Sequence, residues 1–155
     1  MIHKLDQIDR KILEILQANA KITNAQLSKE IGLSPAPTLE RVKKLEVTGL
    51  IQSYHAQLDT EQIGLGVTTF VQVTLIGHKK QFIDAFVEKI SGIDEIIECH
   101  HITGSGDFLL KVIAKDIPAY QKLMSERVSE IEEINSMQSM VILSTFKNSK
   151  VLPIP

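Results

Sequence analysis

Residues 23–46 read TNAQLSKEIGLSPAPTLERVKKLE, and this stretch predicts two short helices joined by a tight turn. Thr23 followed three residues later by a glutamine is the pattern of a capping box, which opens a helix. Gly32 suits the left-handed residue that ends such a helix. Ser34 followed by Pro35 predicts the second helix start, with a side-chain cap and a proline whose missing N–H costs nothing in the first turn.

Apolar residues at helical spacing predict the packed faces of these helices. An earlier helix is predicted over residues 5–20, where acidic residues near the start suit the positive end of the helix dipole. Gly49 ends the last helix, and residues 50–58 alternate only roughly, as in a short hairpin or an extended exit. The N-terminal domain is therefore predicted to span 1–58. The apolar residues expected inside the helix pair are Leu27, Ile31, Leu33, Leu39, Val42 and Leu45.

The second half of the chain changes to a strand-like hydrophobic period. The predicted order strand–helix–strand–strand–helix–strand is the ferredoxin-like βαββαβ arrangement, so the fold class is α+β. Residues 59–66, which hold two glycines, are predicted to be a linker to a second domain over 67–155. The predicted elements are strands over 67–76, 95–103, 108–115 and 139–146, and helices over 81–90 and from Asp116 onward.

Charge and composition limit the classes of protein to which this chain can belong. The whole chain carries −2, but up to Leu58 eight basic residues outnumber six acidic ones, which leaves +2 there and −4 on the rest. This imbalance indicates where an anionic partner would bind. The start of the chain lacks the layout of a signal peptide, no apolar run is long enough to span a bilayer, and a single cysteine, Cys99, forms no internal disulfide. A cytoplasmic protein without a membrane partner is expected.

The outward face of the second helix of the pair is predicted to enter the major groove of double-stranded DNA. Side chains there would reach phosphates and base edges. An ordinary three-helix bundle with a solvated charged face has the same periodicity and is the alternative at this point. The residues predicted to contact DNA are Asn24, Ser34, Pro35, Ala36, Pro37, Thr38, Glu40, Arg41, Lys43 and Lys44.

The strand over 108–115 predicts self-association. Phe108, Leu110, Val112 and Ala114 share the face that two helices would cover. The other face of the sheet is mixed, and a second copy of the chain would cover it. A homodimer would present two recognition helices to a pseudo-palindromic site.

Three other functions are compatible with single features of the sequence. The run Glu98-Cys99-His100-His101 has metal-ligating residue types, but neighbours on a strand point to opposite faces, so no closed metal site is expected. The sequence shows no nucleophile–base constellation and no phosphate loop, so neither an enzyme nor a cofactor is expected. A purely architectural DNA-compacting protein remains an alternative, which DNA specificity would separate from a regulator.

Several segments spread over nearly the whole chain form recognisable motifs. They are LDQIDRKIL (5–13), LSKEIGLSP (27–35), LERVKKLE (39–46), GLI (49–51), Tyr54, ECH (98–100), Gly104, DFLLK (107–111) and Tyr120. These motifs resemble the Lrp/AsnC family of transcription regulators. The resemblance implies a winged helix-turn-helix followed by a ligand-sensing and oligomerisation domain, in dimers that often assemble to octamers. It also implies sequence-specific DNA binding that responds, with the oligomeric state, to an amino acid.

The turn Gly104-Ser105-Gly106-Asp107 is the predicted effector site. By itself the sequence is typical of a hairpin turn, but the resemblance implies effector binding around it, between dimers. Its backbone amides would hold a carboxylate, and Asp107 would receive the ammonium group. Many relatives carry an acidic residue in place of Ser105 and an aromatic one in place of Gly106, so the sequence leaves the effector unidentified. The residues predicted to bind it are Thr103, Gly104, Ser105, Gly106, Asp107, Ser139, Met140 and Val141.

Overall fold

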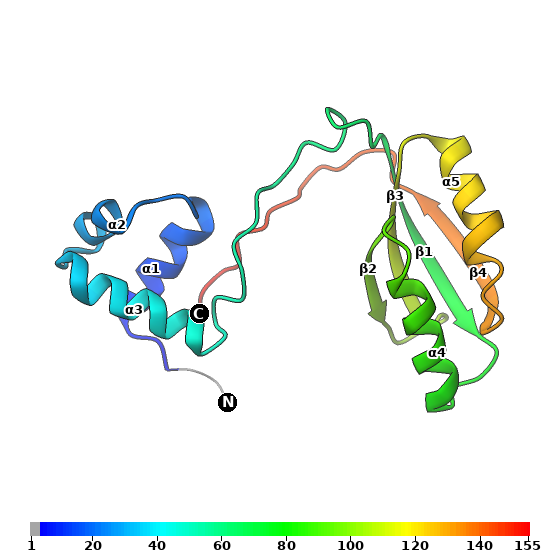
Figure 1. Cartoon of the computed structure of the whole chain (residues 1–155), viewed down its shortest axis with the longest axis horizontal. Helices are drawn as coiled ribbons and strands as arrows, with labels where there is room; N and C mark the ends of the chain where they lie inside the picture. Colours follow the sequence, from blue (N-terminus) through cyan, green and yellow to red (C-terminus); the bar gives the residue numbers. More distant parts are fainter. Residues whose placement is uncertain (1–3) are drawn as a thin grey trace. The chain divides into compact units, whose positions relative to one another are not determined.

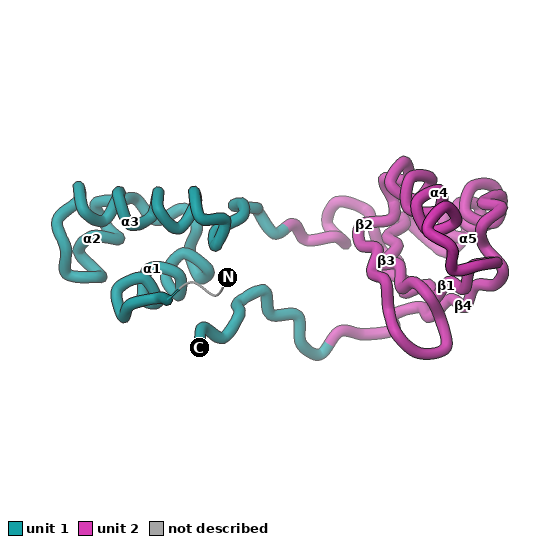
Figure 2. Tube along the Cα trace, turned by 90° about the horizontal axis from the view of Figure 1, so that it is seen from below, with its two compact units in different colours: residues 1–57, 146–155 teal, residues 58–145 magenta. Residues whose placement is uncertain are grey.

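The computed structural model describes residues 4–155, and the chain divides into two compact units (Figure 1). The first unit runs to Gln57 and includes Phe146–Pro155, and the second is Leu58–Thr145 (Figure 2). The predicted boundaries differ from this division, because they assigned the last ten residues to the second domain. None of the described helices is long and apolar enough to cross a membrane.

Three helices build the first unit: α1 (Gln7–Ala18), α2 (Asn24–Ile31) and α3 (Pro35–Val47). Their fully buried apolar side chains are Ile12, Leu27 and Leu45, one from each helix. Half-buried apolar residues of all three helices surround this small core. Among residues 50–58 no strand forms, so the chain leaves α3 as an extended segment.

Local signals start and end these helices as the sequence predicts. Thr23 and Gln26 form the capping box at the start of α2, and Gly32 ends that helix with φ +75°. Ser34 takes the N-cap position of α3, but its side chain makes no capping hydrogen bond, so that part of the prediction is wrong. Proline at N1 therefore starts α3 without help from a side-chain cap.

The second unit consists of both strands and helices. In chain order they are β1 (Val67–Leu75), α4 (Lys80–Ser91), β2 (Ile96–His101), β3 (Phe108–Ala114), α5 (Ile117–Leu123) and β4 (Ile134–Val141). The four strands form an antiparallel sheet in the order β2-β3-β1-β4. This is the predicted ferredoxin-like arrangement, with both helices on one face of the sheet (Figure 2). The last helix continues through Met124–Val128 as predicted, but with π-helical geometry, which the sequence did not indicate.

The core of the second unit lies between the helices and one face of the sheet. Alternate residues of β1 and β3 point into it, as the period-2 pattern predicts. Phe86 of α4 packs against Phe108 of β3, with ring centroids 4.8 Å apart. The β-strand residues buried there are Thr69, Val71, Val73, Leu75, Phe108, Leu110, Val112 and Ala114.

The last strand lies earlier in the sequence than predicted. β4 runs from Ile134 to Val141, whereas the apolar run had placed the strand over 139–146. The reason is pairing: Val141 lies opposite Thr69, near the start of β1, so little of β1 remains for a longer β4 to pair with. Beyond it, Leu143 and Phe146 are almost fully exposed, at 95% and 98%.

Candidate functional site

The N-terminal part of α3 and its outward face are exposed. Ala36, Glu40, Lys43 and Val47 recur at spacings of four, three and four residues, which places them on one side of the helix. Ser34, Pro35, Pro37 and Lys44 are exposed beside them. The surface available to DNA therefore combines small, mostly apolar side chains in the first turn with two lysines farther along.

Thr38 was predicted to face DNA, but it is fully buried and its hydroxyl donates to the carbonyl of Ser34 at 2.9 Å. Leu39 was predicted to be buried and is 43% exposed. The inward stripe of α3 begins one residue earlier than the apolar pattern indicates, because the threonine pairs its hydroxyl within the helix. Thr38 cannot reach DNA without unfolding the turn.

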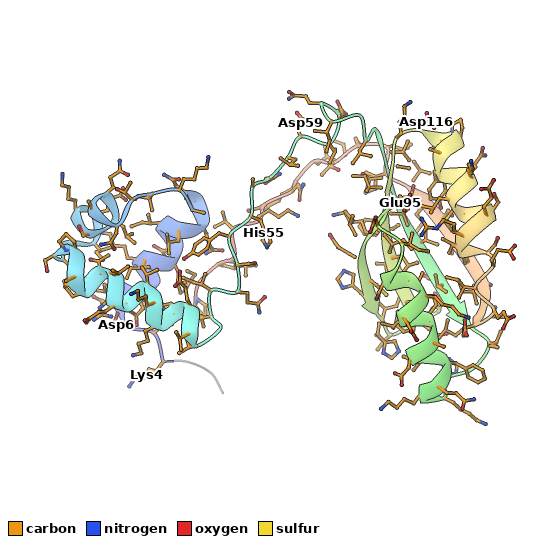
Figure 3. All side chains as sticks on the ribbon, in the orientation of Figure 1. Lys4, Asp6, His55, Asp59, Glu95 and Asp116 are labelled. Atoms are coloured by element: carbon orange, nitrogen blue, oxygen red, sulfur yellow. The ribbon has the colours of Figure 1, made fainter. Side chains whose placement is uncertain are left out.

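Arg41 is held by two carboxylates. Its Nη1 donates to Asp6 at 2.7 Å and to Asp9 at 2.6 Å, and Asp6 lies beside α3 (Figure 3). Asp6 also caps α1 by accepting the backbone N–H of Asp9, and this bond, followed by the one from Arg41, lowers the pKa of Asp6. Both ion pairs raise the pKa of Arg41. The side chain predicted to read DNA thus ties α3 to the start of α1.

Asn24 also has a structural contact within the helix pair. Its Nδ2 donates to the carbonyl of Pro35 at 2.8 Å, which links the start of α2 to the start of α3. Ser28, in a position that favours a small residue, is 3% exposed and donates its hydroxyl to the carbonyl of Ala25. The Asn24 bond holds the start of α2 against the start of α3, whereas the Ser28 bond lies within α2. Neither bond uses the outward face of α3.

The predicted effector turn lies between β2 and β3. Gly104 has φ +120°, a conformation that residues with a side chain rarely adopt. A Cβ on Gly106 would lie 2.4 Å from Cγ of Gln72, whose Nε2 donates to the hydroxyl of Ser105 at 3.1 Å. The two glycines are therefore required for different reasons, one by the backbone and the other by a close neighbour.

Asp107 is already hydrogen-bonded at both carboxylate oxygens. The backbone N–H of Leu75 donates to Oδ2 at 2.8 Å, and Nε2 of His78 lies 2.9 Å from Oδ1. The bond from Leu75, followed by the one from His78, lowers the pKa of Asp107. The Asp107 side chain is 15% exposed and that of His78 is 76% exposed. The Asp107 carboxylate is therefore a charged acceptor, and the His78 side chain that contacts it is exposed to solvent.

Within one chain, β4 does not bring its predicted effector residues to the turn. Ser139 pairs with Val71 and Val141 with Thr69, which is farther along the sheet than Asp107. Ser139 points to the helix side and hydrogen-bonds Tyr120, so Met140 takes the opposite face.

Strand β2 separates its polar side chains as alternation predicts. Glu98 accepts from Lys111 at 2.9 Å and contacts His100 at 3.2 Å, all on the open face of the sheet. His101 stacks on Phe108 on the helix side. Over residues 4–155, no three His, Cys, Asp or Glu side chains are grouped to hold a metal ion.

Three functional neighbours were missed in the sequence. Asp6 and Asp9 carry a signal in the sequence, since acidic residues one turn apart at a helix start face a common direction and can share one cation. His78 lies 29 residues from Asp107, and no local pattern connects them.

Comparison with known proteins identifies both units. The family described as "Lrp/AsnC ligand binding domain" matches residues 68–152, and "Winged helix-turn-helix DNA-binding" matches residues 5–52. The chain therefore belongs to the Lrp/AsnC family of transcription regulators, with a helix-turn-helix DNA-binding domain and a ligand-binding domain; this is not a family of enzymes.

Individual relatives cover almost the whole chain. The leucine-responsive regulatory proteins of Klebsiella pneumoniae and Escherichia coli K12 are each 39% identical over 150 residues, which is 97% of this chain and 92% of each relative. A transcriptional regulator of Neisseria meningitidis, solved in complex with L-Met, has a TM-score of 0.92 at 32% identity and covers 97% of both chains. AsnC of Escherichia coli has a TM-score of 0.89 at 29% identity and covers 97% of this chain and 100% of its own.

Proposed function

We propose that this regulator reads double-stranded DNA with the exposed face of α3. The observation that carries the proposal is that Ala36, Glu40 and Lys43 share the outward side of α3. The opposite side of this helix is packed through Thr38 and Leu45 and ion-paired through Arg41. The small first turn allows close approach to base edges, where methyl groups of thymine accept apolar contact. Lys43 and Lys44 reach phosphates, while Thr38 and Arg41 serve the fold.

Lysine variants test this surface. Lys43→Ala is expected to weaken binding about equally across DNA sequences and to reduce the salt dependence by about one released ion. Lys80→Ala, an exposed charge at the start of α4, is the matched control and is expected to change neither quantity. Unchanged affinity of Lys43→Ala across a salt series would place the DNA surface elsewhere.

We infer that the ligand of the second unit is an amino acid held at the turn over 104–107. A related regulator has been solved with L-Met, and the curated relatives are leucine-responsive. The turn amides bind the carboxylate. The ammonium group takes the place of His78 on Asp107, because that side chain is exposed and easily displaced. Residues 139–141 complete the site from a neighbouring subunit.

Calorimetric titration with L-Leu and L-Met tests the effector site. Asp107→Asn is expected to abolish binding, because the ammonium group loses its charged acceptor. His78→Ala is expected to bind as well as the wild type or better. Retained binding by Asp107→Asn would exclude this carboxylate as the group that binds the ammonium.

Capture of genomic DNA with and without each amino acid tests whether DNA binding is sequence-specific and ligand-dependent. DNA binding without sequence preference would favour an architectural role.

The open face of the sheet supports a homodimer, which family members extend to octamers. Phe70 and Met140 lie side by side on this face, with Leu109 two strands from Met140. A partner sheet would bury these residues together with the Glu98–Lys111 ion pair. Such a dimer carries two α3 helices, and it acts in the cytoplasm, where a regulator meets its DNA.

A further inference from the structure

The DNA-binding unit has an apolar groove outside its core. Among the described residues of the helical unit, from Lys4 on, only three apolar side chains are buried in its core, which is few for a domain of this size. α1 turns further half-buried leucines toward the extended segment after α3, and a groove of about 1000 Å³ lies there. Its lining from these elements is Leu5, Leu13, Leu16, Gln17, Ala18, Ala20 and residues 50–57.

The C-terminal end of the chain occupies one side of this groove. Gln17 of α1 bonds both backbone groups of Leu152: its Oε1 accepts the N–H at 2.6 Å and its Nε2 donates to the carbonyl at 3.2 Å. The amide side chain thus pairs with the segment as a neighbouring strand would. Ile154 is half-buried among the lining residues, whereas Val151 is exposed and lies outside the groove.

The docked residues are connected directly to the ligand-binding unit. β4 ends at Val141, and eight residues, 142–149, precede the docked segment. Such a stretch spans at most about 28 Å when fully extended. The DNA-binding unit is therefore joined to the second unit twice, once through the segment after α3 and once through the end of β4.

We propose that residues 150–155, here called the C-terminal strap, dock in the groove of their own DNA-binding unit and restrict its movement relative to the ligand-binding unit. A second tether shortens the free length between the units. It raises the effective concentration of one recognition helix at a half-site when the other is bound. The strap therefore favours paired half-sites without contacting DNA.

Hydrogen exchange of the full-length protein tests docking, and this readout does not depend on DNA binding. The Leu152 amide is expected to be protected in the wild type and in Glu14→Ala, an exposed α1 position. Gln17→Ala is expected to lose that protection. An unprotected Leu152 amide in the wild type, or unchanged protection in Gln17→Ala, would overturn the proposal.

Binding to paired and to single DNA half-sites tests whether the strap favours paired half-sites. This test rests on the proposed DNA reading. The probes are a duplex selected from a random pool by the wild type and the same duplex with one half-site scrambled. Ile154→Asp is expected to reduce the advantage of the paired site about threefold or more, with single-site affinity unchanged. Val151→Asp is the matched control and is expected to behave as the wild type. An unchanged advantage in Ile154→Asp would overturn the tether.

Photocrosslinking decides whether the C-terminal strap docks in the groove of its own subunit or in that of a second copy. A photoreactive p-benzoylphenylalanine replaces Ile154, and the product is analysed on a denaturing gel. An internal crosslink to α1 that migrates as a monomer is expected. A crosslinked dimer would show docking on a second copy and would overturn the proposal.

Discussion

Arg41 shows how one residue changes role once its neighbours are known. Its guanidinium donates to Asp9, whose side chain is only 14% exposed, and to Asp6. A base-reading arginine would point away from the protein, whereas this one joins α1 to α3. Any loss of DNA affinity in an Arg41 variant must therefore be separated from loss of fold.

We expect Arg41→Ala to lower the free energy of unfolding by about 1 kcal/mol, because charge-assisted hydrogen bonds at a partly exposed site contribute about that much. Urea denaturation measures the change. Asp9→Asn should destabilise in the same direction, and Lys43→Ala, which is exposed, should not. Full stability of Arg41→Ala with lost DNA affinity would return this side chain to the DNA surface.

Asp107 should make the free energy of unfolding depend on pH in the acidic range. Its pKa is lowered from the usual 3.8 in the folded chain, so the carboxylate stabilises the fold fully above the unfolded pKa and loses this effect as pH falls through the lowered value. Asp107→Asn is expected to cost about 2 kcal/mol at pH 7, and the difference from wild type should shrink below pH 3.8. Urea unfolding from pH 7 to pH 2.5 measures this difference.

The matched control for Asp107 is Asp84→Asn, an exposed position on α4, which should leave the acid dependence in place. A difference between Asp107→Asn and the wild type that is constant over the whole pH range would mean that the carboxylate charge is not what stabilises the turn.

The turn between β2 and β3 is specified by backbone geometry at one position and by packing at another. Gly104→Ala should cost about 1–3 kcal/mol through its φ of +120° alone, because nothing lies within 4 Å of its Cβ position. Gly106→Ala should displace Gln72 and break its bond to Ser105. Thermal unfolding of Gly106→Ala with and without Gln72→Ala separates the causes: the second change should rescue Gly106→Ala but not Gly104→Ala.

Helix starts were predictable at the scale of single elements, whereas the ends of β4 were not. The capping box of α2 and the Asp116 cap of α5 depend on residues three apart, so the sequence contains the whole interaction. The end of β4 depends on β1, which lies more than 60 residues earlier. No property of the run over 139–146 reveals where its partner strand starts.

At the scale of the whole molecule, the open face of the sheet decides self-association. Leu109→Asp is expected to shift the protein to monomers, because a buried carboxylate without a partner opposes sheet packing. Val87→Asp, an apolar position of α4 that is 39% exposed, should leave the oligomer intact. Sedimentation velocity measures both, with far-ultraviolet circular dichroism to check folding; an intact Leu109→Asp dimer would place the interface on another surface.

The sequence by itself determined the order of helices and strands, the helix-turn-helix, the buried stripes of β1 and β3, and the family. The elements and the buried stripes follow from hydrophobic period and short-range caps, which act over a few residues. The family follows from the motifs along the chain that resemble those of Lrp/AsnC regulators. Only the tertiary structure decided that Thr38 points inward, that Arg41 pairs with α1, that His78 contacts Asp107, and that residues 146–155 return to the DNA-binding unit. Each of these depends on which distant groups are near enough to compete for a donor or an apolar surface, and that competition exists only after the chain has folded.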